Sequence, residues 1–213
     1  MAKTEPFDKY LYDYEKWFKD NPYVYGSEIE AVRHFVPIEK KGIEIGIGTG
    51  RFAIPFGINE GVEPSVSMKN YSLRLGLKVY DGTAEELPIN NEIYDFALMV
   101  TTICFVDDVN ASFREVRRIL KPGGTFIIGL VDKNSALGKE YEKIKSQNKF
   151  YRDATFYSTD EVQNLLLNNK FNDIEIVQTV FGELSEIKKT QAFLEGYGKG
   201  GFVVIKACKE NNY

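Results

Sequence analysis

Glycines that could bind a nucleoside are concentrated in one short run. Residues 42–51 carry alternating apolar residues and then three glycines in a G-x-G-x-G pattern, Gly46, Gly48 and Gly50. The pattern is typical of a buried strand that ends in a tight loop, where the absence of side chains lets a ligand lie directly on the backbone. Taken alone, such a loop is as consistent with an ordinary strand-to-helix turn as with a nucleoside site.

Two acidic residues stand where a nucleoside site needs them. Glu44 precedes the glycine loop, and Glu63 comes at the end of a second short apolar segment. A carboxylate at the end of the second strand can accept hydrogen bonds from both hydroxyls of a ribose. The loop and the acid together favour a nucleoside site over a plain turn.

Arg51 bears on which nucleoside is bound. A dinucleotide-binding loop follows the pattern G-x-G-x-x-G, whose third glycine would fall at position 51. This chain has arginine there. The departure favours S-adenosylmethionine over NAD, and a nucleotide-dependent oxidoreductase is kept as the less favoured alternative.

Five segments follow one another at ordinary spacing: 44–50, 63–65, 82–88, 94–100 and 118–124. Together they resemble the motifs of class I S-adenosylmethionine-dependent methyltransferases, of the small-molecule type similar to the quinone-biosynthesis methylases. The resemblance implies an α/β fold with a Rossmann-like doubly wound sheet of seven strands. The sheet would be mostly parallel, with an antiparallel hairpin at the C-terminal edge.

The resemblance also implies a set of cofactor-binding residues. Glu63 is expected to bind the ribose hydroxyls and Met68 to flank the adenine, whereas Thr83 stands where many relatives have an aspartate. Tyr14 and Tyr25 could equally pack in the core. The full set is Glu44, Gly46, Gly48, Thr49, Gly50, Glu63, Pro64, Ser65, Met68, Gly82, Thr83, Ala84, Glu85, Thr101, Thr102, Tyr14 and Tyr25.

No residue stands out as a catalytic group. Methyl transfer from a sulfonium requires alignment and exclusion of water, and a general base only if the acceptor arrives protonated. His34 is expected to be a surface or packing residue, Asp107 and Asp108 to begin a helix, and Cys104 to be a small buried residue. A non-catalytic S-adenosylmethionine-binding sensor or scaffold therefore remains a second alternative.

The composition narrows the class of protein further. With 213 residues and a net charge of −4, the chain suits one domain and lacks the basic character of a nucleic-acid-binding protein. Its two cysteines have no metal-binding spacing, residues 1–6 lack the apolar stretch typical of a secretory signal, and no apolar run approaches about 20 residues. We expect a cytoplasmic enzyme with a small-molecule acceptor, no metal and no membrane span. The oligomeric state is not predicted.

The predicted elements form a single domain over residues 1–213. An aromatic segment, 1–26, is expected to act as a lid over the cofactor and acceptor, and 132–157 as an insertion that lines the acceptor pocket. Helices are predicted over about 6–19, 27–34, 49–56, 65–75, 108–120, 135–148 and 158–169, and strands over about 42–47, 58–63, 77–80, 95–100, 125–131, 174–181 and 202–208.

Overall fold

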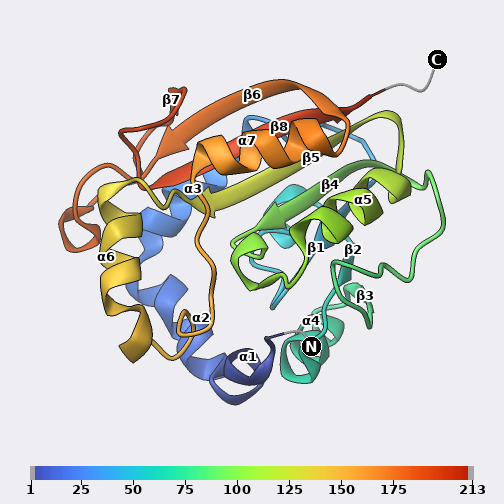
Figure 1. Cartoon of the computed structure of the whole chain (residues 1–213). Coiled ribbons are helices and arrows are strands. Elements are labelled where there is room, and N and C mark those ends of the chain that lie inside the picture. Colours follow the sequence, from blue (N-terminus) through green and yellow to red (C-terminus); the bar gives the residue numbers. More distant parts are fainter. Residues whose placement is uncertain (1–2, 211–213) are drawn as a thin grey trace.

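A single mixed sheet forms the centre of the molecule (Figure 1). The computed structural model describes residues 3–210, so residues 1–2 and 211–213 of the predicted domain lie outside the described part. The strands are β1 Gly42–Ile45, β2 Glu60–Val62, β3 Lys78–Tyr80, β4 Tyr94–Val100, β5 Leu120–Val131, β6 Phe171–Thr179, β7 Leu194–Glu195 and β8 Phe202–Lys209. Their order is β3-β2-β1-β4-β5-β8-β6-β7.

The predicted sheet architecture is confirmed. Strands β1 to β5 are parallel, and β8 lies between β5 and β6 and is antiparallel to both. The described residues form eight strands and not seven, because the two-residue strand β7 pairs with the outer edge of β6. The order reverses between β1 and β4, which is where open α/β sheets bind ligands at the carboxyl ends of their strands.

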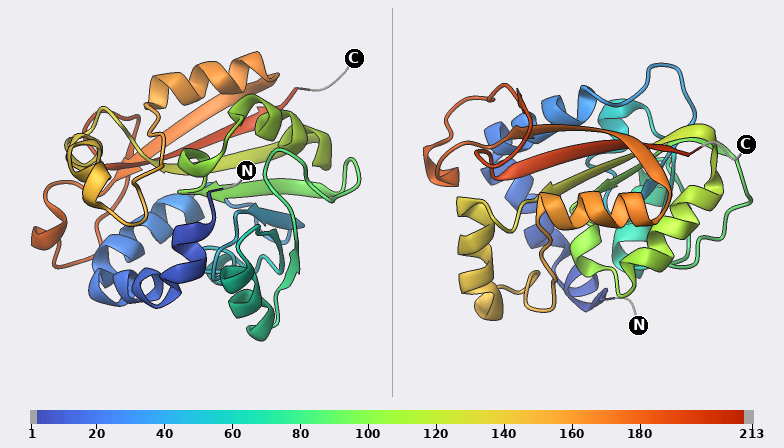
Figure 2. Two further views of the ribbon diagram at one scale, coloured as in Figure 1. Left: turned by 60° about the horizontal axis from the view of Figure 1, so that its bottom comes forward. Right: turned by 45° about the horizontal axis from the view of Figure 1, so that its top comes forward.

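Helices cover both faces of the sheet (Figures 1 and 2). Helices α5 and α7 pack on one face around Phe113, Phe126 and Leu166, whereas α3 packs on the other with Val32. The helices are α1 Glu5–Lys9, α2 Leu11–Asp20, α3 Pro22–Arg33, α4 Val66–Arg74, α5 Val109–Ile119, α6 Ala136–Ile144 and α7 Thr159–Asn168, with single 3₁₀ turns η1 Ile54–Phe56, η2 Ile103–Phe105, η3 Lys145–Gln147 and η4 Leu184–Glu186.

Three of the predicted helix starts, those near residues 65, 108 and 158, are confirmed by their caps. The Ser65 hydroxyl accepts from the Met68 backbone N–H, and Asp108 caps α5. Ser158 and Glu161 form the expected capping box of α7. Each cap satisfies backbone donors that the first helical turn leaves unpaired.

The predictions for the N-terminal segment were partly wrong. The helix expected over 6–19 is two helices broken at Tyr10, and the helix expected over 27–34 begins earlier, at Pro22, so that it includes Tyr23 and Tyr25. Helix α3 begins at Pro22, because proline fits the first helical position, where its missing N–H costs nothing. Ser27, the residue at which the predicted helix starts, is therefore not its N-cap. It lies inside α3, and its hydroxyl donates to the Tyr23 carbonyl at 2.7 Å.

The helix expected over 49–56 is also absent, and only the turn η1 forms there. Gly50 and Gly57 both have positive φ, +83° and +68°, which interrupts a right-handed helix at each end of this segment. The residues after the glycine loop therefore form turns, and they bring Arg51 back toward helix α2.

Candidate functional site

The loop after β1 and the end of β2 meet at the Glu63 carboxylate. Its Oε2 accepts from the Gly48 backbone N–H at 2.8 Å, and its Oε1 accepts from the Ser65 N–H at 2.8 Å. Burial raises the pKa of Glu63 to about 7, more than these two backbone donors lower it. Each carboxylate oxygen has a second lone pair, so Glu63 can accept two further hydrogen bonds.

The loop after β4 lies against the glycine loop. Thr101 has a φ of +51°, an uncommon conformation for a β-branched residue, and its N–H donates to the Gly129 carbonyl at 2.8 Å. A side chain at Gly46 would meet the Thr102 side chain at 2.5 Å. Gly46 is thus required by close approach as well as by its φ of +71°.

The N-terminal helices are tied to both sides of this site. Asp8 of α1 accepts from the Ser65 hydroxyl at 2.7 Å and from the Ser67 N–H at 3.0 Å. Glu15 of α2 accepts from the Thr49 hydroxyl at 2.6 Å and pairs with Arg51. Helices α1 and α2 therefore bridge the start of α4 and the glycine loop.

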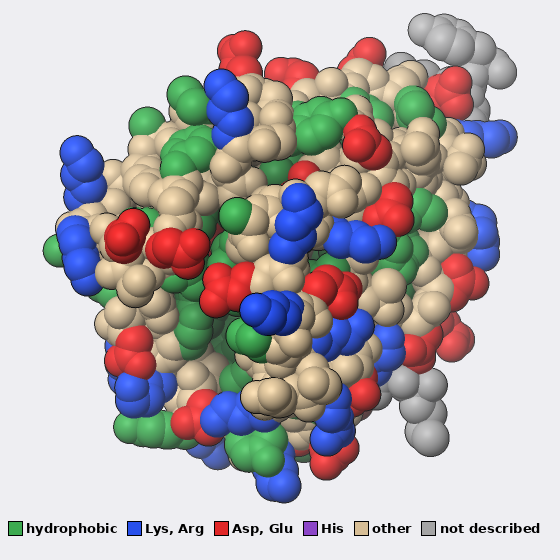
Figure 3. Space-filling view, turned by 60° about the vertical axis from the view of Figure 1, so that its left-hand side comes forward, with side chains coloured by type: hydrophobic (Ala, Val, Ile, Leu, Met, Phe, Trp, Pro, Cys, Tyr) green, Lys and Arg blue, Asp and Glu red, His purple; other side chains and the backbone are tan. Residues whose placement is uncertain are grey.

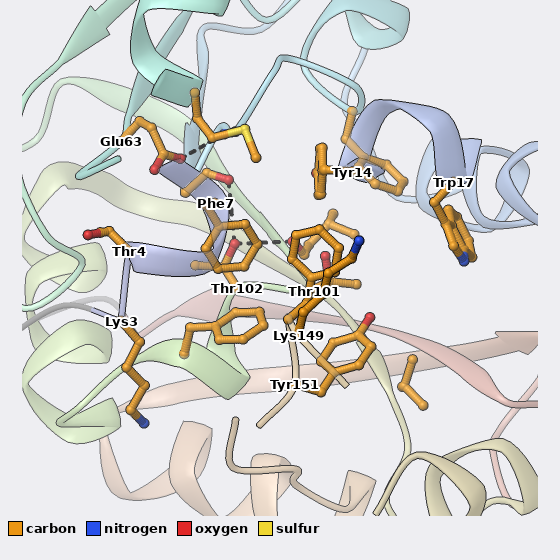
Figure 4. A pocket seen from close by; sticks show the side chains of 18 of the residues that line it. Lys3, Thr4, Phe7, Tyr14, Trp17, Glu63, Thr101, Thr102, Lys149 and Tyr151 are labelled. Carbon is orange, nitrogen blue, oxygen red and sulfur yellow. Dashed lines mark hydrogen bonds between the residues drawn. The ribbon is translucent and has the colours of Figure 1, made fainter. Parts of the chain in front are cut away.

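A cavity of about 690 Å³ opens between these elements. Figure 4 shows Glu63 on one side of it and Trp17 on the other, with Phe7, Thr101, Thr102 and Tyr151 between them. The residues of the predicted set that line the cavity are Tyr14, Gly46, Gly48, Glu63, Pro64, Met68, Gly82, Thr83, Ala84, Glu85, Thr101 and Thr102. The structure thus brings most of the predicted site residues together.

Five predicted residues do not line the cavity. Glu44 and Thr49 are buried, and Thr49 is occupied by its bond to Glu15. Gly50 faces Leu77 and Ile54, while Ser65 caps α4 and bonds to Asp8. Tyr25 packs between Phe18 and Phe52 and donates to the Arg51 carbonyl. The hydroxyl groups of Thr49, Ser65 and Tyr25 are thus used in hydrogen bonds outside the cavity, whereas one carboxylate oxygen of buried Glu44 has no partner among the described residues.

The residues considered for catalysis have structural surroundings. Cys104 is buried beside Ala154 and Phe156, and burial raises its thiol pKa to about 12. His34 is exposed and lies beside Phe35 and Phe193. Asp108 caps α5, and the Asp107 N–H donates to Glu85 at 2.7 Å. None of these contacts points to a nucleophile.

Several cavity residues lie in the segments predicted to form the acceptor pocket but were not identified individually from the sequence. Six aromatic residues of the cavity lining are here called the aromatic chamber: Phe7, Trp17, Phe105, Tyr141, Phe150 and Tyr151. Glu28 of α3 also lines the cavity, and Val24 lies one helical turn before it on the same lining. The available signal was the buried face of α3, on which Glu28 follows Val24 by four positions.

Comparisons with known proteins agree with this geometry. A family model described as a methyltransferase domain matches residues 43–128. An uncharacterised protein of Methanocaldococcus jannaschii is 44% identical over 95% of this chain and 98% of its own length. A Rickettsia bellii ubiquinone/menaquinone biosynthesis C-methyltransferase is 29% identical over 53% of this chain, which spans 43% of that protein.

A crystal structure from Thermotoga maritima is similar along nearly the whole chain. It is described as an S-adenosylmethionine-dependent methyltransferase and possible histamine N-methyltransferase, with 47% identity, a TM-score of 0.94, and coverage of 96% of this chain and 98% of that one. These similarities decide against the oxidoreductase alternative. The chain belongs to the S-adenosylmethionine-dependent methyltransferases.

Proposed function

We propose that this enzyme methylates a small molecule held in the aromatic chamber. The observation that carries the proposal is one continuous cavity of about 690 Å³, which is lined by the glycine loop and Glu63 and also by the aromatic chamber. The volume falls within the ~300–1,000 Å³ typical of small-molecule sites. One cavity with a polar, glycine-lined side and an aromatic side suits a cofactor and an acceptor bound next to each other.

The residues at the polar side fit S-adenosylmethionine. Gly48 lines the cavity with a φ of +54°, and a side chain there would project to within 3.3 Å of the Tyr14 hydroxyl. The Glu63 carboxylate has the remaining lone pairs for two ribose hydroxyls. Met68 and residues 82–85 line the part of the cavity suited to the adenine.

The bound cofactor supplies a methyl group on a positively charged sulfur. The chain's task is to orient the acceptor toward that methyl group and to keep water out. We assign exclusion of water to the N-terminal segment and to 132–157, because Phe7, Trp17, Tyr141 and Tyr151 come from these two segments and line the cavity. The N-terminal segment is thus proposed as a lid, and 132–157 as an insertion that lines the acceptor pocket.

A small acceptor is favoured over a nucleic acid by the surface. On the face in Figure 3, Lys and Arg side chains are intermingled with Asp and Glu, whereas a phosphate-binding surface gathers positive charge. Within residues 3–210 we find no helix long and apolar enough to cross a bilayer. The description of the Thermotoga structure makes small amines the first acceptors to test.

The test is transfer of labelled methyl groups from S-adenosylmethionine to a panel of amines, phenols and quinols, with bulk tRNA and a mixture of unfolded proteins as macromolecular acceptors. The proposal expects label in at least one small molecule and none in the macromolecules. Label confined to tRNA or protein would contradict it. Tight S-adenosylmethionine binding without any label transfer would favour the sensor alternative.

A further inference from the structure

Glu28 is an acid buried at the cavity without a partner. It lies on the buried face of α3, its exposed fraction is 7%, and it lines the cavity. Within residues 3–210 its side-chain carboxyl group makes neither a hydrogen bond nor an ion pair. The other buried acid on the cavity lining, Glu63, differs in having two backbone donors on its carboxylate.

An unpaired buried carboxyl group is unfavourable for folding. Removing a carboxylate from water without a compensating partner is costly, so the group tends to stay protonated. Burial alone raises the pKa of Glu28 to about 8. An apolar residue of similar size would stabilise the fold better at this position, so Glu28 needs an explanation outside stability.

The protein's own cations do not neutralise Glu28. Three lysines line the cavity, and each forms an ion pair with an aspartate. The pairs are Lys3 with Asp107 at 3.9 Å, Lys16 with Asp20, and Lys149 with Asp13 at 2.5 Å. Lys16 and Lys149 are also solvent-exposed. The buried charged residues on the cavity lining, Glu28 and Glu63, are both acids.

The surroundings of Glu28 suit an organic cation. In its charged form Glu28 raises the pKa of Tyr141, where burial is the larger cause, and that of Tyr151, where burial, Tyr141 and Cys104 are larger causes. It therefore lies within electrostatic reach of these two phenols. The two rings stack with centroids 5.1 Å apart. Aromatic faces attract cations, and they do so more strongly away from water.

We propose that Glu28 binds a protonated amine of the acceptor, an inference that rests on the proposed small-molecule methyl transfer. A protonated nitrogen has no lone pair to offer a methyl group. The amine held by Glu28 is therefore a second group of the acceptor, separate from the atom that is methylated. When the cation binds, Glu28 releases its proton to solvent and pairs as a carboxylate. The acceptor class is an aromatic or apolar body with a cationic side arm.

The test uses matched pairs of probes in which a hydroxyl replaces the amine: histamine and imidazole-4-ethanol, tyramine and tyrosol, tryptamine and tryptophol. Binding of each is measured by calorimetry to protein saturated with S-adenosylhomocysteine. The proteins are the wild type, Glu28→Gln, and the control Glu30→Gln, which changes an exposed acid of the same helix that pairs with Arg33. Thermal melting checks that each variant is folded.

For wild type and Glu30→Gln we expect at least one amine to bind tenfold or more tighter than its alcohol. In Glu28→Gln that preference should vanish, while the affinity for S-adenosylhomocysteine stays within twofold. An amine preference that survives in Glu28→Gln overturns the proposal, as does a wild type that never prefers an amine. If the wild type fails to bind S-adenosylhomocysteine at all, the proposed function itself fails and this inference falls with it.

Discussion

The Glu15 carboxylate is paired with the guanidinium of Arg51, the residue that occupies the position of the third glycine in a dinucleotide-binding loop. The same carboxylate also accepts from the Thr49 hydroxyl at 2.6 Å and from the Tyr71 hydroxyl at 3.3 Å. An N-terminal helix thereby holds the loop that follows β1. Arg51, which replaces the third glycine of the dinucleotide pattern, thus makes a structural contact with α2.

Replacing Glu15 with glutamine should destabilise the protein by about 1–3 kcal/mol, because it leaves the half-buried Arg51 without its counter-charge. Urea unfolding measures the change. The matched control is Glu175→Gln, whose acid forms an exposed pair with Lys206 and should contribute no more than about 0.5 kcal/mol. Equal losses in the two variants would show that the Glu15 pair is only a surface contact.

Glu63→Gln should weaken S-adenosylhomocysteine binding by about ten- to a hundredfold, since hydrogen bonds to a charged acceptor contribute ~1.5–3 kcal/mol. Calorimetry on the folded variant measures this. The control is Glu86→Gln, because Glu86 is exposed in the turn beside Glu85 and does not line the cavity. An unchanged dissociation constant in Glu63→Gln would remove Glu63 from the cofactor site.

The stability of the ligand-free protein should fall as pH rises from about 4.5 to about 8, in part because of Glu28. Its folded pKa of about 8 exceeds its ordinary value of 4.5, so the folded form binds the proton more tightly. This contribution is complete below the lower pKa and is lost as pH rises through the higher one.

The glutamine of Glu28→Gln has no titratable group. The free energy of unfolding of this variant, relative to that of wild type, should therefore increase as pH rises from 5 to 8.5. Each unit of pKa shift corresponds to on the order of 1.4 kcal/mol. Urea unfolding at the two pH values measures the gain, and Glu30→Gln should show none. A stability difference between Glu28→Gln and wild type that is the same at both pH values would mean that Glu28 is not titrating in the folded protein.

Residues 5–20 should exchange their amide hydrogens more slowly when S-adenosylhomocysteine binds. Phe7, Tyr14 and Trp17 line the cavity from α1 and α2, so a bound ligand would add contacts to these helices. Hydrogen exchange followed by mass spectrometry resolves the segment, and α7 should change little because none of its residues line the cavity. If α1 and α2 show the same exchange with and without ligand, they are packing elements and not a lid.

The segment proposed as a lid is shorter than the predicted 1–26. Helix α3 begins at Pro22 and buries Val24, Ile29 and Val32 against the core, so the proposed lid ends near Asn21. A truncated protein that begins at Ser27 would cut α3 in half. A truncated protein for testing the lid should therefore begin at Asn21, the residue between the end of α2 and the start of α3.

The parts of the site that could be predicted are those with local causes. The glycine loop follows directly from the residues of 42–51, and the position of Glu63 follows from the end of its strand. The Ser65 and Ser158 caps follow from their own first turns. In each case the residue type and its immediate neighbours determine the backbone, so the sequence pattern is sufficient.

The parts that could not be predicted depend on contacts between distant segments. Nothing near Glu15 shows that it meets Arg51, and nothing near Asp8 shows that it meets Ser65. Glu28 is the sharpest case, because a glutamate in a short amphipathic helix ordinarily lies on the exposed face. Only the packing of α3 against β6 and β8 places that carboxyl group at the cavity.

A crystal structure with S-adenosylhomocysteine tests the central claim most directly. The account predicts that both ribose hydroxyls donate to the Glu63 carboxylate, that the adenine lies against Met68, and that the sulfur faces the aromatic chamber near Thr101. A nucleoside bound away from Glu63, or a sulfur turned away from Phe7 and Tyr151, would contradict it.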